Sequence, residues 1–333
     1  MRKIMYFIKP KFWDKKNYSF LSIILYPLSI IYYIALLIKK KFISTKKFSV
    51  PIICIGNIYI GGTGKTSAAI EVFKILNKLK KTCFLTSGYG RTNNKDIYLD
   101  KLNYEEESLE NTGDESRLLN QFGNVYISNN RAKAINLIKN LGYEIIVLDD
   151  GFQDSSVYKD INILCFDSKN WIGNGQLIPA GPLREPVSCI KNADFLIIKG
   201  ENNEKIEKEA KKINPNINIL RMENKIENIK ILKNKTYVAF CGIGNPDNFF
   251  ETLENHNIKI KKKIIYPDHF NFSEKNYEFL FNEAKNNNCE LITTEKDYIR
   301  INPENKNKIY YTKLSNTLIG NELLTTKLYK LFK

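Results

Sequence analysis

The chain has 333 residues, more than one hydrophobic core usually organises, so two domains are expected. Hydrophobic residues make up 43% of it, which excludes a wholly disordered chain. Its formal net charge of +15 would suit a nucleic acid, a membrane surface or a phosphorylated substrate, but +10 of it falls in the first fifty residues. No basic and aromatic pattern typical of a nucleic-acid-binding surface accompanies that charge, so no nucleic-acid partner is expected.

The longest apolar run, residues 19–38, contains no charged residue and has about the ~20 residues that a helix needs to cross a bilayer. Pro27 in its middle favours a kinked or broken helix. Lysines lie on both sides of the run: Lys15, Lys16, Lys39, Lys40 and Lys41. We therefore expect residues 1–45 to form a membrane-associated helical segment in the cytoplasmic leaflet, with its lysines on anionic inner-membrane lipids. A true span and a soluble core helix are the alternatives.

From residue 50 onward, strand-like and helix-like segments alternate. An apolar strand over 50–55 is followed by a glycine-rich turn and a helix over 66–80. Further strands are predicted over 82–86, 125–128, 144–148, 162–166, 195–198, 218–221, 236–241, 259–265, 291–294 and 308–311. This alternation predicts an α/β fold, a mostly parallel sheet with helices on both faces. A polar stretch over 201–235 ends the first domain, which gives a domain over 46–232 and a smaller C-terminal α/β domain over 233–333.

The sharpest local motif is GNIYIGGTGKT at 56–66. Its glycines let backbone N–H groups converge on phosphate oxygens, Lys65 can reach the β- and γ-phosphates, and Thr66 can ligate Mg²⁺. The strict P-loop pattern would need glycine at position 59, where this chain has Tyr59. The strand before the loop and the helix after it still favour a P-loop NTPase-type fold that binds ATP. The phosphate-contacting residues are then Gly61, Gly62, Thr63, Gly64, Lys65 and Thr66.

A carboxylate at the end of a neighbouring strand is the expected partner of Mg²⁺ in such a site. The strand over 144–148 ends in Asp149 and Asp150. On its own, an apolar strand ending in acids is more often a plain turn. Together with the glycine-rich loop it predicts a Mg²⁺ site.

Four other segments carry charge in glycine- or proline-rich turns. Arg91 could reach phosphate from the SGYGR turn, and Asp114 in GDE could instead be a helix cap. Arg184 and Glu185 lie in a stiff, proline-rich loop, for which a surface salt bridge is the plainer explanation. His269, next to an acid in the second domain, could act as a general base or assist one across a cleft, although a lone histidine is usually structural.

Eight motifs occur in a fixed order along the chain. They are GNIYIGGTGKT (56–66), SGYGR (87–91), GDE (113–115), DDGFQ (149–153), GNGQLIPAGPLREP (173–186), CGIGNP (241–246), PDHFNF (267–272) and TEKD (294–297). Together they resemble the tetraacyldisaccharide 4'-kinase family, the lipid A 4'-kinases of Gram-negative bacteria. The resemblance spans most of the chain, including the N-terminal segment.

The resemblance implies two α/β domains with the active site in the cleft between them. It implies transfer of the γ-phosphate of ATP to the 4'-hydroxyl of an acylated glucosamine disaccharide 1-phosphate, giving lipid IVA. The enzyme would be peripheral or monotopic, at the cytoplasmic face of the bacterial inner membrane. Lys65 and Thr66 would hold the phosphates and Mg²⁺, and Asp149 and Asp150 would serve the metal and its waters.

The same resemblance assigns roles to residues outside the loop. Asp114 with His269 would form the base pair that activates the sugar hydroxyl. The other matching active-site positions are Glu115, Gln153, Arg184 and Glu185. Such an arrangement is coherent, because phosphoryl transfer mainly needs positioning, charge neutralisation and an oriented nucleophile.

Three positions depart from the family pattern: Ser87 replaces the usual arginine, Asp154 a common histidine, and Phe270 a frequent second histidine. The competing interpretation is a membrane-associated P-loop switch ATPase of the chromosome- or septum-positioning kind. Its signature lysine would fall at position 60, where this chain has Ile60. It also has no need for the proline-rich or PDHFNF loops.

Overall fold

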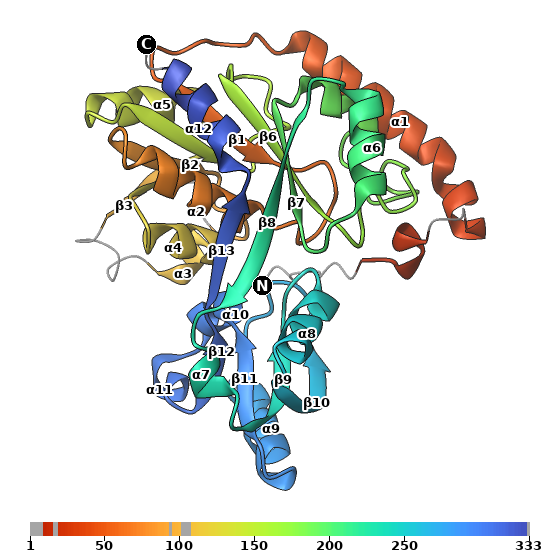
Figure 1. Ribbon diagram of the computed structural model, residues 1–333, viewed down its shortest axis with the longest axis vertical. Coiled ribbons are helices and arrows are strands. Elements are labelled where there is room, and N and C mark those ends of the chain that lie inside the picture. Colours follow the sequence, from red (N-terminus) through yellow and green to blue (C-terminus); the bar gives the residue numbers. More distant parts are fainter. Residues whose placement is uncertain (1–8, 16–18, 93–94, 101–107, 332–333) are drawn as a thin grey trace. The chain divides into compact units, whose positions relative to one another are not determined.

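The structure is a computed structural model that describes residues 9–15, 19–92, 95–100 and 108–331 (Figure 1). Lys16, part of the expected basic flank of the apolar run, lies outside these residues. The chain divides into two compact units. The larger comprises Pro10–Glu223 and Asn316–Lys333, and the smaller is built on Asn224–Ser315.

Within the described residues, the larger unit contains a nine-stranded sheet in the order β13-β8-β7-β6-β1-β5-β2-β4-β3. Its strands are β1 (Ile52–Gly56), β2 (Thr82–Thr86), β3 (Ile97–Leu99), β4 (Val125–Ile127), β5 (Ile145–Asp149), β6 (Ile161–Asp167), β7 (Phe195–Lys199), β8 (Asn218–Ile226) and β13 (Leu314–Ile319). The pairs from β8 through β1 to β4 are parallel, and β3 pairs antiparallel with β4. The predicted, mostly parallel α/β fold is confirmed.

Helices cover both faces of this sheet, as the alternating sequence predicted. They are η1 (Lys11–Asp14), α1 (Phe20–Phe42), α2 (Lys65–Leu76), α3 (Leu109–Thr112), α4 (Asp114–Asn120), α5 (Arg131–Asn140), η2 (Val187–Asn192), α6 (Glu204–Ile213) and α12 (Asn321–Lys330). Buried apolar clusters form where these helices pack on the sheet. One cluster packs α5 on β1, β2 and β5, and another packs η2 and α6 on β6 and β7.

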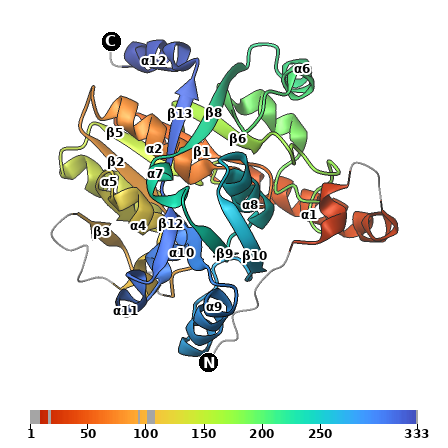
Figure 2. The same ribbon diagram turned by 60° about the horizontal axis from the view of Figure 1, so that its bottom comes forward.

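The last strand of the chain, β13, was not expected from its sequence, LSNTLI, which alternates only weakly. It is the hydrogen-bonded neighbour of β8, and the two strands lie side by side (Figure 1, Figure 2). In α12, which follows it, Leu324 and Leu328 are buried. Residues Asn316–Lys333 therefore group with the larger unit, whereas the sequence placed all of 233–333 in the second domain.

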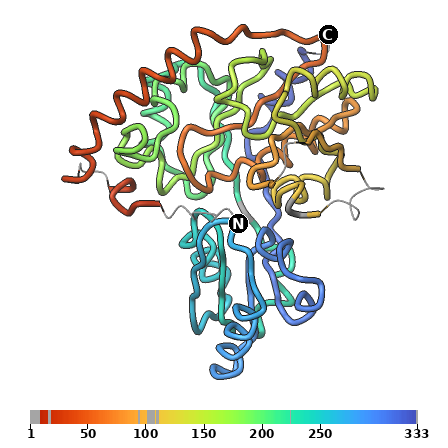
Figure 3. Tube along the Cα trace, turned by 180° about the vertical axis from the view of Figure 1, so that it is seen from behind, coloured from red at the N-terminus to blue at the C-terminus, as the bar shows by residue number. Residues whose placement is uncertain are grey.

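Helix α1 runs without a break from Phe20 to Phe42, so Pro27 does not split it as the sequence suggested. It lies along the outside of the larger unit (Figure 3). Within the described residues it is the one helix long and apolar enough to cross a membrane by length and composition. Its most exposed apolar side chains include Phe20, Ile23, Ile24, Ile31, Ile38 and Phe42.

The smaller unit contains a parallel four-stranded sheet in the order β10-β9-β11-β12 among the described residues. The strands are β9 (Thr236–Cys241), β10 (Lys259–Ile265), β11 (Glu290–Thr294) and β12 (Ile309–Thr312). Its helices are α7 (Ile229–Leu232), α8 (Pro246–Asn255), α9 (Glu274–Asn286), α10 (Glu295–Arg300) and α11 (Pro303–Lys306). Apolar side chains of α8 and α9 pack in two separate buried clusters on this sheet.

Candidate active site

The glycine-rich loop connects the end of β1 to the start of α2. Gly61 and Gly64 have φ angles of 131° and 81°, which side chains other than glycine rarely adopt, and Gly64 is the residue before the first turn of α2. Strand β1 lies between β5 and β6, and Ile55 is opposite Asp149 of β5. The loop and the end of β5 therefore meet at the carboxyl edge of the sheet, where ligands bind in open α/β folds.

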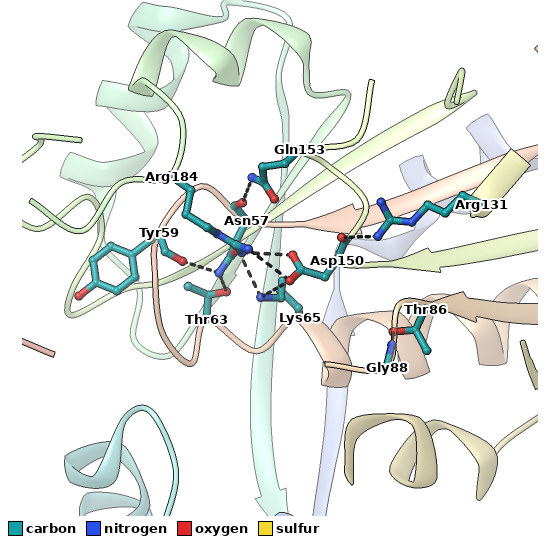
Figure 4. A network of polar contacts seen from close by, with 10 residues as sticks. All are labelled: Asn57, Tyr59, Thr63, Lys65, Thr86, Gly88, Arg131, Asp150, Gln153 and Arg184. Atoms are coloured by element: carbon teal, nitrogen blue, oxygen red, sulfur yellow. Dashed lines mark hydrogen bonds and ion pairs between the residues drawn. The ribbon is translucent and has the colours of Figure 1, made fainter. Parts of the chain in front are cut away.

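Asp150, the residue after β5, is contacted by two cations from different segments (Figure 4). Nζ of Lys65 lies 3.4 Å from its Oδ2. Arg184 donates from Nη1 to Oδ2 at 3.3 Å and from Nη2 to Oδ1 at 3.1 Å. The fold thus brings together Lys65, Asp150 and Arg184, three predicted site residues that are far apart in the sequence.

The charge balance around Asp150 favours its ionised form. Burial alone would raise the pKa of this carboxyl, but Lys65 and Arg184 outweigh burial and hold the pKa below its usual value of 3.8. Its φ of 52° is uncommon for a residue other than glycine. Asp150 is therefore a carboxylate held in an unusual backbone conformation beside two cations.

Asn57, which its sequence pattern did not mark as a site residue, connects these residues to the loop. Its Oδ1 accepts hydrogen bonds from Lys65 at 3.3 Å and from Arg184, and its Nδ2 donates to Oγ1 of Thr63 at 2.8 Å. Gln153, a predicted site residue, donates to the backbone oxygen of Asn57 at 2.7 Å. The signal available in the sequence was its position inside the glycine-rich motif.

Arg131 at the start of α5 was also missed, because nothing in its local sequence marks it. Its Nη2 donates to the backbone oxygen of Asp150 at 2.9 Å, and its Nη1 lies 2.8 Å from Oδ2 of Asp154. Asp154 also accepts from the backbone and the hydroxyl of Ser156. Burial alone would raise the pKa of Asp154, but hydrogen bonds from Ser156 and Arg131 outweigh burial and hold the pKa below its usual value of 3.8. Asp154, a departure from the family pattern, thus holds the arginine that contacts the Asp150 backbone.

Thr66 and Asp149 offer the donors that Mg²⁺ prefers. Both are buried, and both lie at the carboxyl edge, Thr66 in the first turn of α2 and Asp149 at the end of β5. Among the described residues, no group of three or more His, Cys, Asp or Glu side chains could hold a metal ion by itself. One carboxylate and one hydroxyl beside the glycine-rich loop fit Mg²⁺, which usually binds one or two carboxylates together with substrate phosphates.

Asp114 and Glu115 form the first turn of α4, and Asp114 is buried. Gly113 before them has a φ of 78°, and a Cβ there would lie 2.7 Å from the backbone oxygen of Tyr89. The GDE segment is therefore packed against the SGYGR turn. In that turn, Arg91 donates to the backbone oxygen of Lys95, and burial lowers its pKa.

Glu185, unlike its neighbour Arg184, points to the N-terminal helix. Its Oε2 lies 2.7 Å from Nζ of Lys40, and the thiol of Cys189 donates to the same oxygen at 3.4 Å. Its side chain is only 2% exposed. Burial, with Glu185 nearby, raises the pKa of Cys189 to about 12.

His269 belongs to the smaller unit, in the turn after β10, with a φ of 59°. Its backbone N–H donates to the oxygen of Gly242 at 3.0 Å, and its Nδ1 lies 3.4 Å from Nη2 of Arg300. Its Nε2 lies 3.7 Å from Oδ1 of Asp268. The neighbouring acid that the sequence indicated is therefore close to the ring, and Arg300 adds a cation that the sequence did not reveal.

Comparison with known proteins gives concordant results. The family model described as "Tetraacyldisaccharide-1-P 4'-kinase" matches residues 21–333. A tetraacyldisaccharide 4'-kinase of Pelagibacter ubique is 40% identical over 330 residues, covering 97% of this chain and 98% of that protein. One of Rickettsia akari is 35% identical over 333 residues, covering 99% and 98%.

A solved structure resembles the fold over nearly its full length. The crystal structure of LpxK from Aquifex aeolicus in complex with ATP superimposes with a TM-score of 0.73 at 27% sequence identity. The match covers 94% of this chain and all of that one.

Proposed function

Because this chain belongs to the tetraacyldisaccharide-1-phosphate 4'-kinase family, we propose that Lys65, Arg184 and Asp150 form the centre at which it transfers phosphate. The chain is an ATP-dependent kinase of lipid A biosynthesis, and its substrate is a tetraacylated disaccharide 1-phosphate. The switch-ATPase alternative is not favoured, since the family match covers nearly the whole chain.

The observation that supports this centre is the convergence of Lys65 and Arg184 on one carboxylate beside the glycine-rich loop. Lys65 would contact the β- and γ-phosphates of ATP, with the backbone of the loop over residues 61–64. Arg184 would neutralise charge that develops on the transferred phosphoryl group. Asn57 holds both cations by one oxygen and so fixes their spacing.

Thr66 and Asp149 are the proposed ligands of Mg²⁺, with Asp150 on its waters. The metal would neutralise phosphate charge and fix the geometry of the triphosphate. Thr66→Ala should raise the Mg²⁺ concentration needed for half-maximal activity. Thr63→Ser is the matched control, because it keeps the hydroxyl that Asn57 contacts. An unchanged Mg²⁺ requirement in Thr66→Ala would exclude Thr66 as a ligand.

Asp114 and His269 are the proposed residues that activate the 4'-hydroxyl. Asp114 starts a helix in the larger unit, and His269 lies in a turn of the smaller one. Glu115 and Gln153 would support this site, by their match to the family motifs. Joint action of Asp114 and His269 predicts that the double variant Asp114→Asn, His269→Ala loses little more activity than the worse single variant.

The exposed apolar side of α1 is the proposed membrane contact. Its side chains would enter the acyl region of the cytoplasmic leaflet of the inner membrane, while Lys39 and Lys41 would contact anionic headgroups. An acylated substrate resides in the same layer, which supports the membrane as the partner of this side of α1. Co-sedimentation with vesicles of phosphatidylcholine and phosphatidylglycerol tests it, and Ile31→Asp should weaken binding.

The decisive experiment is transfer of labelled γ-phosphate from ATP to lipid A disaccharide 1-phosphate in detergent micelles. Labelled lipid should form with Mg²⁺ present, and Lys65→Met and Arg184→Ala should each lower its rate by about 10²-fold or more. ATP hydrolysis without a labelled lipid would contradict the assignment. Wild-type rates in Arg184→Ala would remove Arg184 alone from the proposed centre.

A further inference from the structure

Helix α1 has its polar side toward the protein and its apolar side outward. Its two buried residues are both serines, Ser22 and Ser29. They are seven residues apart, about two helical turns, and Lys40 follows Ser22 by eighteen residues, or five turns, so the three lie on one line along the helix. A helix that only inserted into lipid would not need such a line of polar groups.

The first of these serines binds the proline-rich loop over residues 174–186. The hydroxyl of Ser22 donates to the backbone oxygen of Ala180 at 2.7 Å and accepts from Nδ2 of Asn174 at 3.0 Å. Asn174 donates to the same Ala180 oxygen at 2.9 Å. Ser22, Asn174 and Ala180 thus form a closed, buried polar contact between the helix and the loop.

Ser29 makes two more contacts with the same loop. Its hydroxyl donates to the backbone oxygen of Leu177 at 2.8 Å and accepts from the backbone N–H of Ala180 at 3.0 Å. One side chain therefore satisfies a backbone acceptor and a backbone donor three residues apart. Without that hydroxyl, the buried N–H of Ala180 would lose this partner, which proteins rarely tolerate.

The C-terminal half of α1 binds the end of the loop, at the site residues themselves. The hydroxyl of Tyr32 donates to the backbone oxygen of Arg184 at 2.9 Å, and Lys40 pairs with the buried Glu185. On its other side, the N–H of Arg184 donates to the oxygen of Ile58 in the glycine-rich loop at 2.7 Å. The backbone of Arg184 is thus held between α1 and the loop that precedes Lys65.

We infer that Ser22, Ser29, Tyr32 and Lys40 are positioning residues for phosphoryl transfer: they hold the proline-rich loop so that Arg184 stays on Asp150 beside Lys65. The helix that presents apolar side chains outward is then also a structural part of the nucleotide site. This inference rests on the proposed role of Arg184, and it does not depend on how deeply α1 enters a membrane.

Tyr32→Phe is the sharpest test, because it removes one hydroxyl and keeps the ring. In micelles with saturating lipid substrate, it should lower kcat/KM for ATP by about fivefold, since Arg184 loses a backbone contact. The matched control is Tyr33→Phe, the same change at the next residue, which is 38% exposed; it should stay within twofold of wild type. Binding of Tyr32→Phe to phosphatidylcholine and phosphatidylglycerol vesicles should be unchanged.

A double-mutant cycle separates positioning from general destabilisation. If Tyr32 acts through Arg184, then Tyr32→Phe should lower kcat/KM for ATP by less than about twofold in an Arg184→Ala background. Ser29→Ala, with its folding checked by thermal unfolding, should behave in the same way. An undiminished effect in that background, or wild-type kcat/KM in Tyr32→Phe, would overturn the inference. Wild-type kcat/KM in Arg184→Ala alone would instead remove Arg184 from the proposed centre, the role on which this inference rests.

Discussion

Arg300 lies with its Nη2 3.4 Å from Nδ1 of His269, inside the smaller unit. A guanidinium carries only donors, so this contact favours the ring tautomer in which Nδ1 accepts and Nε2 carries the proton. The ring is then arranged to donate from Nε2. In the proposed reaction His269 would therefore orient an acidic group, and Asp114 would be the group that takes the proton from the sugar hydroxyl.

The first prediction compares two replacements of His269. His269→Ala should lower kcat by about 10²-fold, because the donor is lost. His269→Gln, whose amide keeps a donor near the position of Nε2, should lose about tenfold less. Both are measured as kcat at saturating ATP and lipid substrate. His256→Gln is the control, since Nδ1 of His256, the residue after α8, contacts the backbone oxygen of Thr252 at 2.8 Å. Equal losses in the two His269 variants would contradict the donor role.

The second prediction concerns the buried pair that holds Arg300. Nη1 of Arg300 lies 3.0 Å from Oδ1 of Asp297, and Asp297 also accepts from the backbone N–H of Gly242 at 3.0 Å. Both side chains are almost fully buried. Arg300→Met should lower the free energy of unfolding by about 3 kcal/mol, because it leaves the Asp297 charge buried without this partner.

Urea unfolding followed by fluorescence measures this loss. Arg300→Lys keeps the charge and should lose less stability than Arg300→Met. Arg221→Met is a suitable control, because Arg221, whose side chain is 40% exposed, pairs with Glu207. An ion pair at such an exposed position contributes only about 0–1 kcal/mol. An equal shift in the midpoints of Arg300→Met and Arg221→Met would count against the buried-pair explanation.

Local patterns were sufficient to predict the strands around the site and the loop itself. The apolar runs before Asp149 and the glycine-rich motif are short-range signals, and their adjacency follows from parallel pairing of β1 with β5. The contacts of Asn57 and Arg131 could not be predicted, because their partners come from distant segments. The orientation of α1 was missed for a different reason: Ser22 and Ser29 were counted within an apolar run, although their seven-residue spacing was visible.

The third prediction is a pH dependence of stability that comes from Asp150. Its pKa in the folded chain is below the usual 3.8, so its charge stabilises the fold above that value, and the contribution is lost as the pH falls toward the lowered pKa. Wild-type protein should therefore lose stability below about pH 4. Between pH 5 and 3 the melting temperature of Asp150→Asn should fall less steeply than that of wild type, because one carboxylate no longer contributes to the pH dependence. Asp247→Asn, at an exposed position, should keep the wild-type slope. Identical slopes in Asp150→Asn and wild type would exclude this charge as a source of the acid lability.

The fourth prediction uses two glycines with similar positive φ angles and different surroundings. Gly113 and Gly142 have φ angles of 78° and 76°. A Cβ on Gly113 would lie 2.7 Å from the backbone oxygen of Tyr89, whereas a Cβ on Gly142 would meet only Nζ of Lys81, at 3.8 Å. Both alanine variants should lose about 1–3 kcal/mol of stability, because alanine is strained at positive φ.

Only Gly113→Ala should also impair catalysis. Relief of its clash with Tyr89 requires the SGYGR turn and the start of α4 to move apart, and Asp114 is the first residue of that helix. A displacement of the proposed proton acceptor by a few tenths of an ångström should lower kcat by about tenfold. Steady-state kcat of Gly113→Ala and Gly142→Ala, compared at a temperature where both are folded, separates the positional effect from the loss of stability that strain at positive φ causes. If kcat falls equally in the two variants, the loss comes from reduced stability, and the placement of Asp114 by Gly113 does not limit the reaction.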